Sequence, residues 1–145
     1  MLAMRRALEP PLPTSWRASA VMRANRNRDT RPELALRSAL HRRGPRFRVH
    51  YLVTASEKAV RPDIVFPRAK TAVFVDGCFW HRCPDHGTMP RANPDYWRRK
   101  LQRNVWRDRS VDRELRASGW FVVRVWEHEP LADAAAKVIA VVRPT

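Results

Sequence analysis

Apolar residues recur at helical spacing in three segments of the chain. The first segment begins after Thr30, where Thr30 and Glu33 fit a capping box, with Thr30 as the N-cap and Glu33 reaching back from the third helical position. This segment ends at the stretch RRGP, residues 42–45. The second segment covers residues 95–118 and carries arginines on the face opposite its apolar residues. The third segment covers residues 130–142. The pattern therefore predicts three helices.

Four further segments are rich in apolar and β-branched residues, as strands are. They cover residues 46–53, 63–66, 71–77 and 119–126. Residues 71–77 are largely apolar, which is typical of a strand buried on both faces. The order of helix, three strands, helix, strand and helix predicts an α/β fold, a mixed β-sheet flanked by helices.

The length of the chain suits one domain. A chain of 145 residues can bury a single core without disulfide bonds. We expect residues 21–145 to form this domain and residues 1–20, which are proline-rich and aperiodic, to form a flexible tail. No apolar run is long enough for a signal peptide or a membrane span, and two cysteines cannot form a disulfide framework. We therefore expect a reduced cytoplasmic protein that associates with the nucleoid and not with a membrane.

The charge of the chain indicates its partner. Lys and Arg number 29 against 14 Asp and Glu, which gives a formal net charge of +15, and only four of the cations are lysines. Arginine guanidinium groups bind phosphates through two donors and stack on bases. The composition favours a nucleic-acid partner over a basic protein that lacks one.

The stretch VDGCFWHRCPDHG, residues 75–87, combines candidate metal ligands with two adjacent aromatic residues. Cys78, Cys83 and His86 have the spacing of a tight structural Zn²⁺ turn. The best remote ligand is His128, which follows a predicted strand. The alternative is a pair of free thiols beside surface histidines.

Two residues suggest hydrolytic chemistry. Asp63 begins a predicted strand, and its carboxylate, a backbone carbonyl of the next strand and water would form an oxygen-rich Mg²⁺ site. His81 is not needed as a zinc ligand and could act as a general base. The alternative for Asp63 is a strand-entry aspartate that follows Pro62.

Phe79 and Trp80 are adjacent aromatics in a segment between two cysteines. Apolar side chains of this kind can wedge between base steps and kink a duplex. The alternative is that one ring packs under the zinc loop.

The motif DGCFWH, with RPD upstream and NVWRDR and LRASGWFVVRVWEHE downstream, resembles the very short patch repair family of T:G mismatch DNA endonucleases. The resemblance covers roughly residues 20–130. It implies a restriction-endonuclease-like fold, a structural zinc, and Mg²⁺-dependent nicking 5′ of the mismatched thymine. This reaction starts the repair of deaminated 5-methylcytosine.

The resemblance also implies roles for individual residues in catalysis. Asp63 matches the metal-binding aspartate, His81 the catalytic histidine, and Glu33 a glutamate near the active site. Val75 would contribute its backbone carbonyl to Mg²⁺. Asp76 stands where a well-known member has histidine, so it could add a second carboxylate or hydrogen-bond His81. A lysine of the common nuclease motif is absent, and His81 would have to take its place.

Further matches concern DNA and zinc. Phe79 and Trp80 match intercalating aromatics, and Met22 matches a residue that wedges from the other groove, next to Arg23 in an arginine-rich segment. Zinc-ligand positions are occupied by Cys78, Cys83, His128 and, as the fourth, His86.

The expected substrate is double-stranded DNA with a T:G mismatch, bound by a monomer, with mismatch-repair proteins as candidate partners. Two alternatives stay open. One is a restriction-type or general DNA endonuclease without mismatch preference, and the other is a zinc-stabilised DNA-binding module without catalysis.

Overall fold

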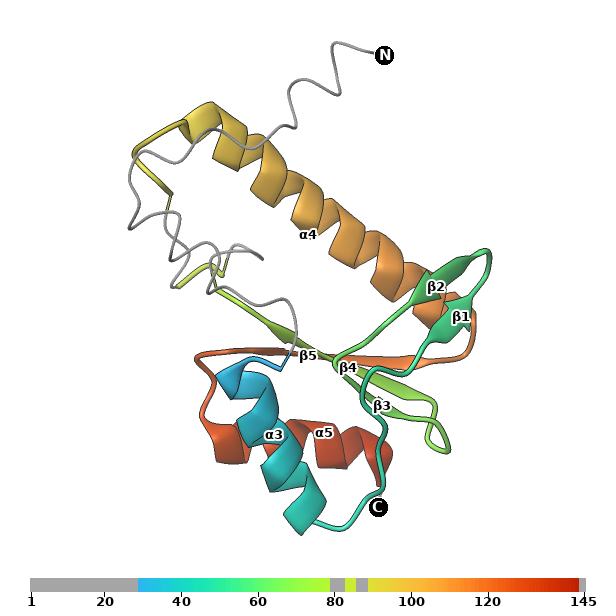
Figure 1. Ribbon diagram of the computed structural model, residues 1–145. Coiled ribbons are helices and arrows are strands. Elements are labelled where there is room, and N and C mark those ends of the chain that lie inside the picture. Colours follow the sequence, from blue (N-terminus) through green and yellow to red (C-terminus); the bar gives the residue numbers. More distant parts are fainter. Residues whose placement is uncertain (1–28, 79–82, 86–88, 144–145) are drawn as a thin grey trace.

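The computed structural model describes residues 29–78, 83–85 and 89–143, and Figure 1 shows their arrangement. The helices in this part of the chain are α3 (Arg31–Arg42), α4 (Pro94–Ala117) and α5 (Leu131–Val142). The strands are β1 (Val53–Ala55), β2 (Lys58–Val60), β3 (Ile64–Phe66), β4 (Thr71–Asp76) and β5 (Phe121–Trp126). The fold is mixed α/β, as the sequence pattern predicts.

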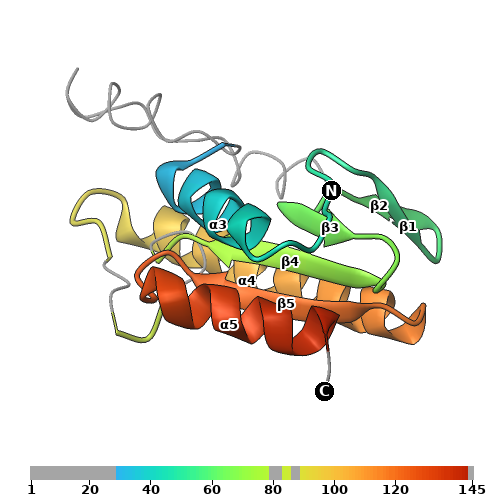
Figure 2. The same cartoon turned by 90° about the horizontal axis from the view of Figure 1, so that it is seen from below.

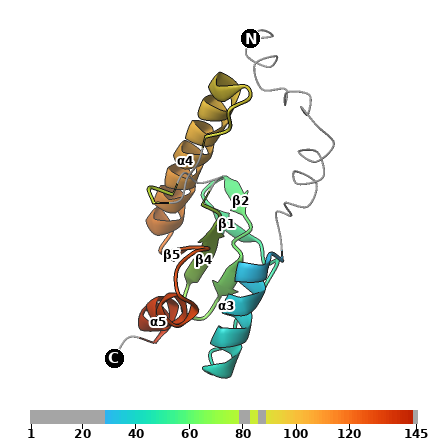
Figure 3. The same cartoon turned by 90° about the vertical axis from the view of Figure 1, so that its left-hand side faces the viewer.

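A three-stranded sheet with the order β3-β4-β5 lies at the centre of the fold. The β3–β4 pair is antiparallel and the β4–β5 pair is parallel, so the sheet is mixed. The hairpin of β1 and β2 forms a separate two-stranded sheet. In Figures 2 and 3, α3 and α5 lie side by side on one face of the central sheet, and α4 crosses the opposite face.

Alternate residues of the central strands supply the two cores, because successive side chains of a strand point to opposite faces. On the α3 and α5 face, Phe66, Val73 and Val123 pack against Leu40 and Val138 of the two helices. The core on the other face joins α4 and the β1–β2 hairpin to the sheet through Val53, Ala55, Val65, Ala72 and Leu115. Strand β4 therefore lies between two layers, which explains its largely apolar sequence.

The ends of two helices follow from their sequences. At the start of α3, the Thr30 side chain accepts a hydrogen bond from the backbone N–H of Glu33, which confirms the predicted N-cap. At the end of α4, Gly119 has φ +86°. The N–H groups of Gly119 and Trp120 donate to the carbonyls of Arg116 and Leu115, which is a Schellman motif. This motif delays β5 to residue 121, two residues after the predicted start.

One predicted strand is wrong. Residues 46–52 form only an isolated bridge between Arg48 and Val65, and the strand β1 begins at Val53, the last residue of the predicted strand. His50 has φ +56°, in the left-handed region, and this conformation interrupts the extended backbone. The strand β2 was not predicted, because its three residues are not buried and carry no alternating pattern.

No helix among the described residues is long and apolar enough to cross a membrane. The predicted tail and the boundary of the single domain at residue 21 fall outside the described residues.

Candidate active site and metal centre

Asp63 directly precedes β3, at the end of the β3–β4 pair that is opposite the turn between the two strands. Its backbone N–H donates to the carbonyl of Val73, and its carboxylate oxygen Oδ2 accepts a 2.7 Å hydrogen bond from the N–H of Val75. The N–H and C=O of one strand residue project to the same side of the strand. The Val75 carbonyl therefore projects to the same edge of β4 as the Asp63 carboxylate, where the sequence predicts that the two would meet.

Glu33 projects from the first turn of α3 and is buried, with 4% of its surface exposed. Its Oε2 accepts from the backbone N–H of Asp29, one residue before the N-cap, and lies 3.4 Å from Nη2 of Arg37. The backward reach of Glu33 is thus confirmed, but it is directed to Asp29 and not to Thr30. Because Arg37 is one helical turn further along α3, the pair fixes the glutamate side chain.

These carboxylates influence one another. The pKa of Asp63 is raised to about 7, chiefly by burial and also by the negative charges of Glu33 and Asp76, against the hydrogen bond from Val75 and the charge of Arg37. Burial also raises the pKa of Glu33, although the hydrogen bond from Asp29 and the charge of Arg37 oppose the change. Mutual repulsion in a buried group of carboxylates is relieved by a cation.

Asp76 ends β4 and is also buried. Its Oδ1 lies 2.9 Å from Nη1 of Arg124, which is on the neighbouring strand β5. The structure therefore gives Asp76 a cationic partner that the sequence did not predict. Asp76 lies close enough to Asp63 for its negative charge to raise the pKa of Asp63.

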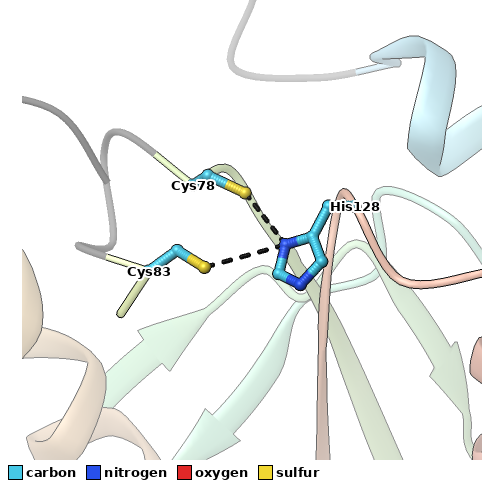
Figure 4. A group of neighbouring side chains, drawn as sticks. All are labelled: Cys78, Cys83 and His128. Carbon is cyan, nitrogen blue, oxygen red and sulfur yellow. Dashed lines mark hydrogen bonds between the residues drawn. The ribbon is translucent and has the colours of Figure 1, made fainter. Parts of the chain in front are cut away.

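Cys78, Cys83 and His128 form a second cluster, shown in Figure 4. The Nδ1 atom of His128 lies 3.1 Å from Sγ of Cys78 and 3.7 Å from Sγ of Cys83. Tetrahedral zinc, with Zn–S near 2.3 Å and Zn–N near 2.0 Å, separates adjacent S and N donors by about 3.5 Å. Two sulfurs and one imidazole nitrogen at these distances fit a zinc ion.

The backbone around this cluster is fixed from two strand ends. The N–H of Cys78 donates to a carboxylate oxygen of Glu127, and the N–H of Glu127 donates to the carbonyl of Asp76. The N–H of Cys83 donates to the carbonyl of Cys78. The residues that follow β4 and β5 are thus held together, which brings His128 to the cysteines. Burial and the neighbouring Cys83 and Glu127 raise the pKa of the Cys78 thiol to about 11 in the absence of a cation.

Several predicted site residues lie outside the described residues. They are His81 and His86, the aromatic pair Phe79 and Trp80, and Met22 and Arg23. The structure brings together the other predicted groups in two sets, Asp63 with Val75, Glu33 and Asp76, and Cys78 with Cys83 and His128.

Sequence reasoning missed Arg37 and Arg124. Arg37 could have been found from its position four residues after Glu33 on a predicted helix. Arg124 is the single charged residue within the apolar run FVVRVW, and a charge at a half-buried strand position indicates a partner on the facing element.

A buried group of carboxylates at a sheet edge, an adjacent Cys/His cluster and a strongly basic chain are together typical of a hydrolase that acts on DNA. A family model described as DNA mismatch endonuclease Vsr matches residues 13–85. The chain belongs to the Vsr family and is a DNA endonuclease.

Individual relatives agree with this assignment. The chain is 53% identical over 130 residues to the Type II nicking enzyme V.NaeI of Lentzea aerocolonigenes, which covers 89% of this chain and 78% of that relative. It is 42% identical over 120 residues to the Type II nicking enzyme V.XorIIP of Xanthomonas oryzae pv. oryzae, covering 80% and 82%. It is 36% identical over 120 residues to the DNA mismatch endonuclease Vsr of Escherichia coli K12, covering 79% and 74%.

Proposed function

We propose that the protein nicks one strand of DNA on the 5′ side of the thymine in a T:G mismatch, by Mg²⁺-dependent hydrolysis, and so starts very short patch repair of deaminated 5-methylcytosine. The observation that carries the chemistry is the hydrogen bond between Asp63 and the Val75 peptide, with Glu33 and Asp76 close enough to raise the pKa of Asp63. The name of the Escherichia coli relative supports the mismatch, and the names of the other two relatives support a nick.

The carboxylate of Asp63 and the carbonyl of Val75 would hold the Mg²⁺ ion. Oxygen donors of this kind are the ones that Mg²⁺ prefers, with water in the other positions. When bound, the ion supplies charge that polarises the phosphodiester and stabilises the departing oxygen. The burial and mutual repulsion of the carboxylates support a cation at this place.

The remaining groups would manage water and protons. Glu33, fixed by Asp29 and Arg37, would accept a hydrogen bond from a water molecule and orient it. His81 would take the proton from the attacking water as general base and would occupy the role that a lysine has in the common nuclease motif. Asp76, paired with Arg124, would contribute charge near Asp63.

Cys78, Cys83 and His128, with His86 as the fourth ligand, would hold a structural zinc. The ion would join the segments that follow β4 and β5, since these two segments supply the three clustered ligands. A closed site of this kind stabilises the fold and takes no part in the reaction. We also propose that residues 21–145 form a single restriction-endonuclease-like domain, which the mixed sheet between helical layers supports.

Recognition would combine charge with deformation of the duplex. The exposed face of α4 carries Arg98, Arg99, Arg103, Arg107 and Arg109, which suits phosphate binding. Phe79 and Trp80 would insert into the weakly stacked mismatched step, and Met22 and Arg23 would contact the other groove. The protein would act as a monomer in the cytoplasm, at the nucleoid, with mismatch-repair proteins as partners.

Two variants separate this function from its alternatives. The double variant Phe79→Ala/Trp80→Ala should lose the preference for a T:G duplex over the matched C:G duplex, because deformation at the mismatch would no longer be used. A general nuclease would nick both duplexes equally before and after the change. The variant Asp63→Ala should bind DNA but not nick it, whereas a non-catalytic binding module would show no nicking in any form of the protein.

A further inference from the structure

Arg124 is a charged side chain that contacts both the central sheet and α4 beside Asp76. It lies on β5 opposite Phe74 of β4, and its guanidinium carbon is 4.3 Å from the centre of the Phe74 ring. On the helix side, Asp112 of α4 accepts from Nε at 2.9 Å and lies 2.7 Å from Nη2. The carboxylate of Asp108, one turn earlier, lies 3.8 Å from Nη2. The guanidinium is thus held by the sheet and by α4 at once.

This arrangement leaves one nitrogen of Arg124 for β4. Its Nη1 donates to Oδ1 of Asp76 at 2.9 Å, and the two side chains are 20% and 8% exposed. Ion pairs at this depth contribute little net stability, and apolar residues of similar volume often stabilise a fold better. The network is therefore better explained by the orientation that it gives to Asp76 than by the stability of the sheet.

Fixing Asp76 also fixes the Val75 carbonyl, because that carbonyl belongs to the peptide group that links Val75 to Asp76. Arg124 holds the side chain of Asp76, and the N–H of Glu127 donates to its backbone carbonyl. The preceding N–H, on Val75, donates to Asp63. The last peptide groups of β4 are consequently held from both sides at the place where the catalytic ion is proposed to bind.

We propose that Arg124 is a positioning residue of the nuclease centre and that it acts through Asp76. It transmits the position of α4, through Asp108 and Asp112, to the Val75–Asp76 peptide. In this role Arg124 would act on the ion only through Asp76 and the Val75–Asp76 peptide. This inference rests on the proposed function of Asp63 and Val75 as the ligands of the catalytic ion.

The test is a double-mutant cycle of Arg124→Gln and Asp76→Asn. Each protein is assayed for single-turnover nicking of a cleavable duplex in saturating Mg²⁺, and for DNA affinity with Ca²⁺ in place of Mg²⁺. Arg124→Gln should slow nicking by about 10- to 100-fold, the usual effect of removing a group that orients a metal ligand. DNA affinity should stay within about twofold of wild type, since the loss concerns a step after binding. In the Asp76→Asn background the same change should slow nicking little further, because its target is already altered.

The control variant is Lys137→Met. Lys137 donates to the backbone carbonyl of Arg124 and pairs with Glu129. Its replacement therefore perturbs the same strand but leaves the pair of Arg124 and Asp76 in place. Its nicking rate should equal that of wild type, and thermal unfolding of every variant reports on the fold. If Arg124→Gln does not fold, Asp112→Asn removes a partner of the guanidinium and leaves the pair with Asp76. It should then give a smaller loss of rate at unchanged DNA affinity.

Three results would overturn the inference. The first is a wild-type nicking rate in Arg124→Gln or, in its place, in Asp112→Asn. The second is a double variant in which the rate losses of the two single variants multiply. The third is a loss of DNA affinity that accounts for the whole loss of nicking. A wild-type protein that nicks no duplex contradicts the proposed function instead. A wild-type protein that nicks, with an unchanged rate in the variant, contradicts the role of Arg124 alone.

Discussion

Replacement of Asp63 by Asn should change the pH dependence of stability in a direction that the structure fixes. Burial raises the pKa of Asp63 from an ordinary 3.8 to about 7. Between about pH 4 and pH 7, Asp63 holds a proton in the folded protein and releases it in the unfolded chain. This difference stabilises the folded state; the stabilisation is complete below about pH 4 and is lost as the pH rises to about 7. At about 1.4 kcal/mol for each unit of pKa, the loss amounts to about 4 kcal/mol. Asn at this position stays neutral and can still accept the hydrogen bond from Val75.

The assay is denaturant unfolding of wild type and Asp63→Asn in Mg²⁺-free buffer at a series of values between pH 5 and pH 8. No chelator is used, because it would also remove the zinc proposed to bind at Cys78, Cys83 and His128. The difference between the two proteins isolates Asp63, and wild type should lose about 3 kcal/mol relative to the variant across this range. Asp133→Asn, at an exposed position on α5, is the control and should follow wild type. A difference that is constant with pH, or that grows in favour of wild type, would refute the reasoning.

Four further outcomes are expected. Mg²⁺ at pH 8 should raise the unfolding temperature of wild type but not of Asp63→Asn, because a ligand stabilises only a fold that binds it; equal shifts would place the ion elsewhere. Elemental analysis should find one equivalent of zinc per chain in wild type and none in Cys83→Ser, and the variant should lose a large part of the roughly 10 kcal/mol that a structural zinc provides. Wild type without zinc would contradict this. Glu33→Gln should slow nicking by about 10- to 100-fold at unchanged DNA affinity. An unaltered rate would mean that Glu33 serves only to cap the helix. Gly119→Ala should lower the free energy of unfolding by about 1 kcal/mol in denaturant titration, because φ is positive there; no change would argue against the Schellman turn.

The helices could be predicted because their signals are local. The N-cap at Thr30 and the long amphipathic pattern of α4 each lie within one stretch of sequence, and the structure confirms both. The strand predicted at residues 46–53 was wrong because a left-handed residue at His50 interrupts an otherwise β-rich run. Such a conformation at a non-glycine residue depends on tertiary context and leaves no clear mark in the sequence.

The residues of the site also differ in whether local sequence is enough to predict them. Residue chemistry and spacing suggested Cys78 and Cys83, and a strand end suggested His128; the structure brings the three together. The partner of Asp76 could not be predicted, because Arg124 is 48 residues away and reaches it only through the parallel pairing of β4 and β5. Contacts between distant segments are set by sheet register, which the pattern of one strand does not specify.

The most direct test of the account uses duplexes that carry one T:G pair in a methylation-type context, labelled at the 5′ end of either strand, beside the matched C:G duplex. The purified protein with Mg²⁺ should produce a single nick in the thymine strand, immediately 5′ of the mismatched base. The C:G duplex should stay intact, and Asp63→Ala should nick neither. Equal cleavage of both duplexes, or nicks in both strands, would contradict the proposed mismatch endonuclease.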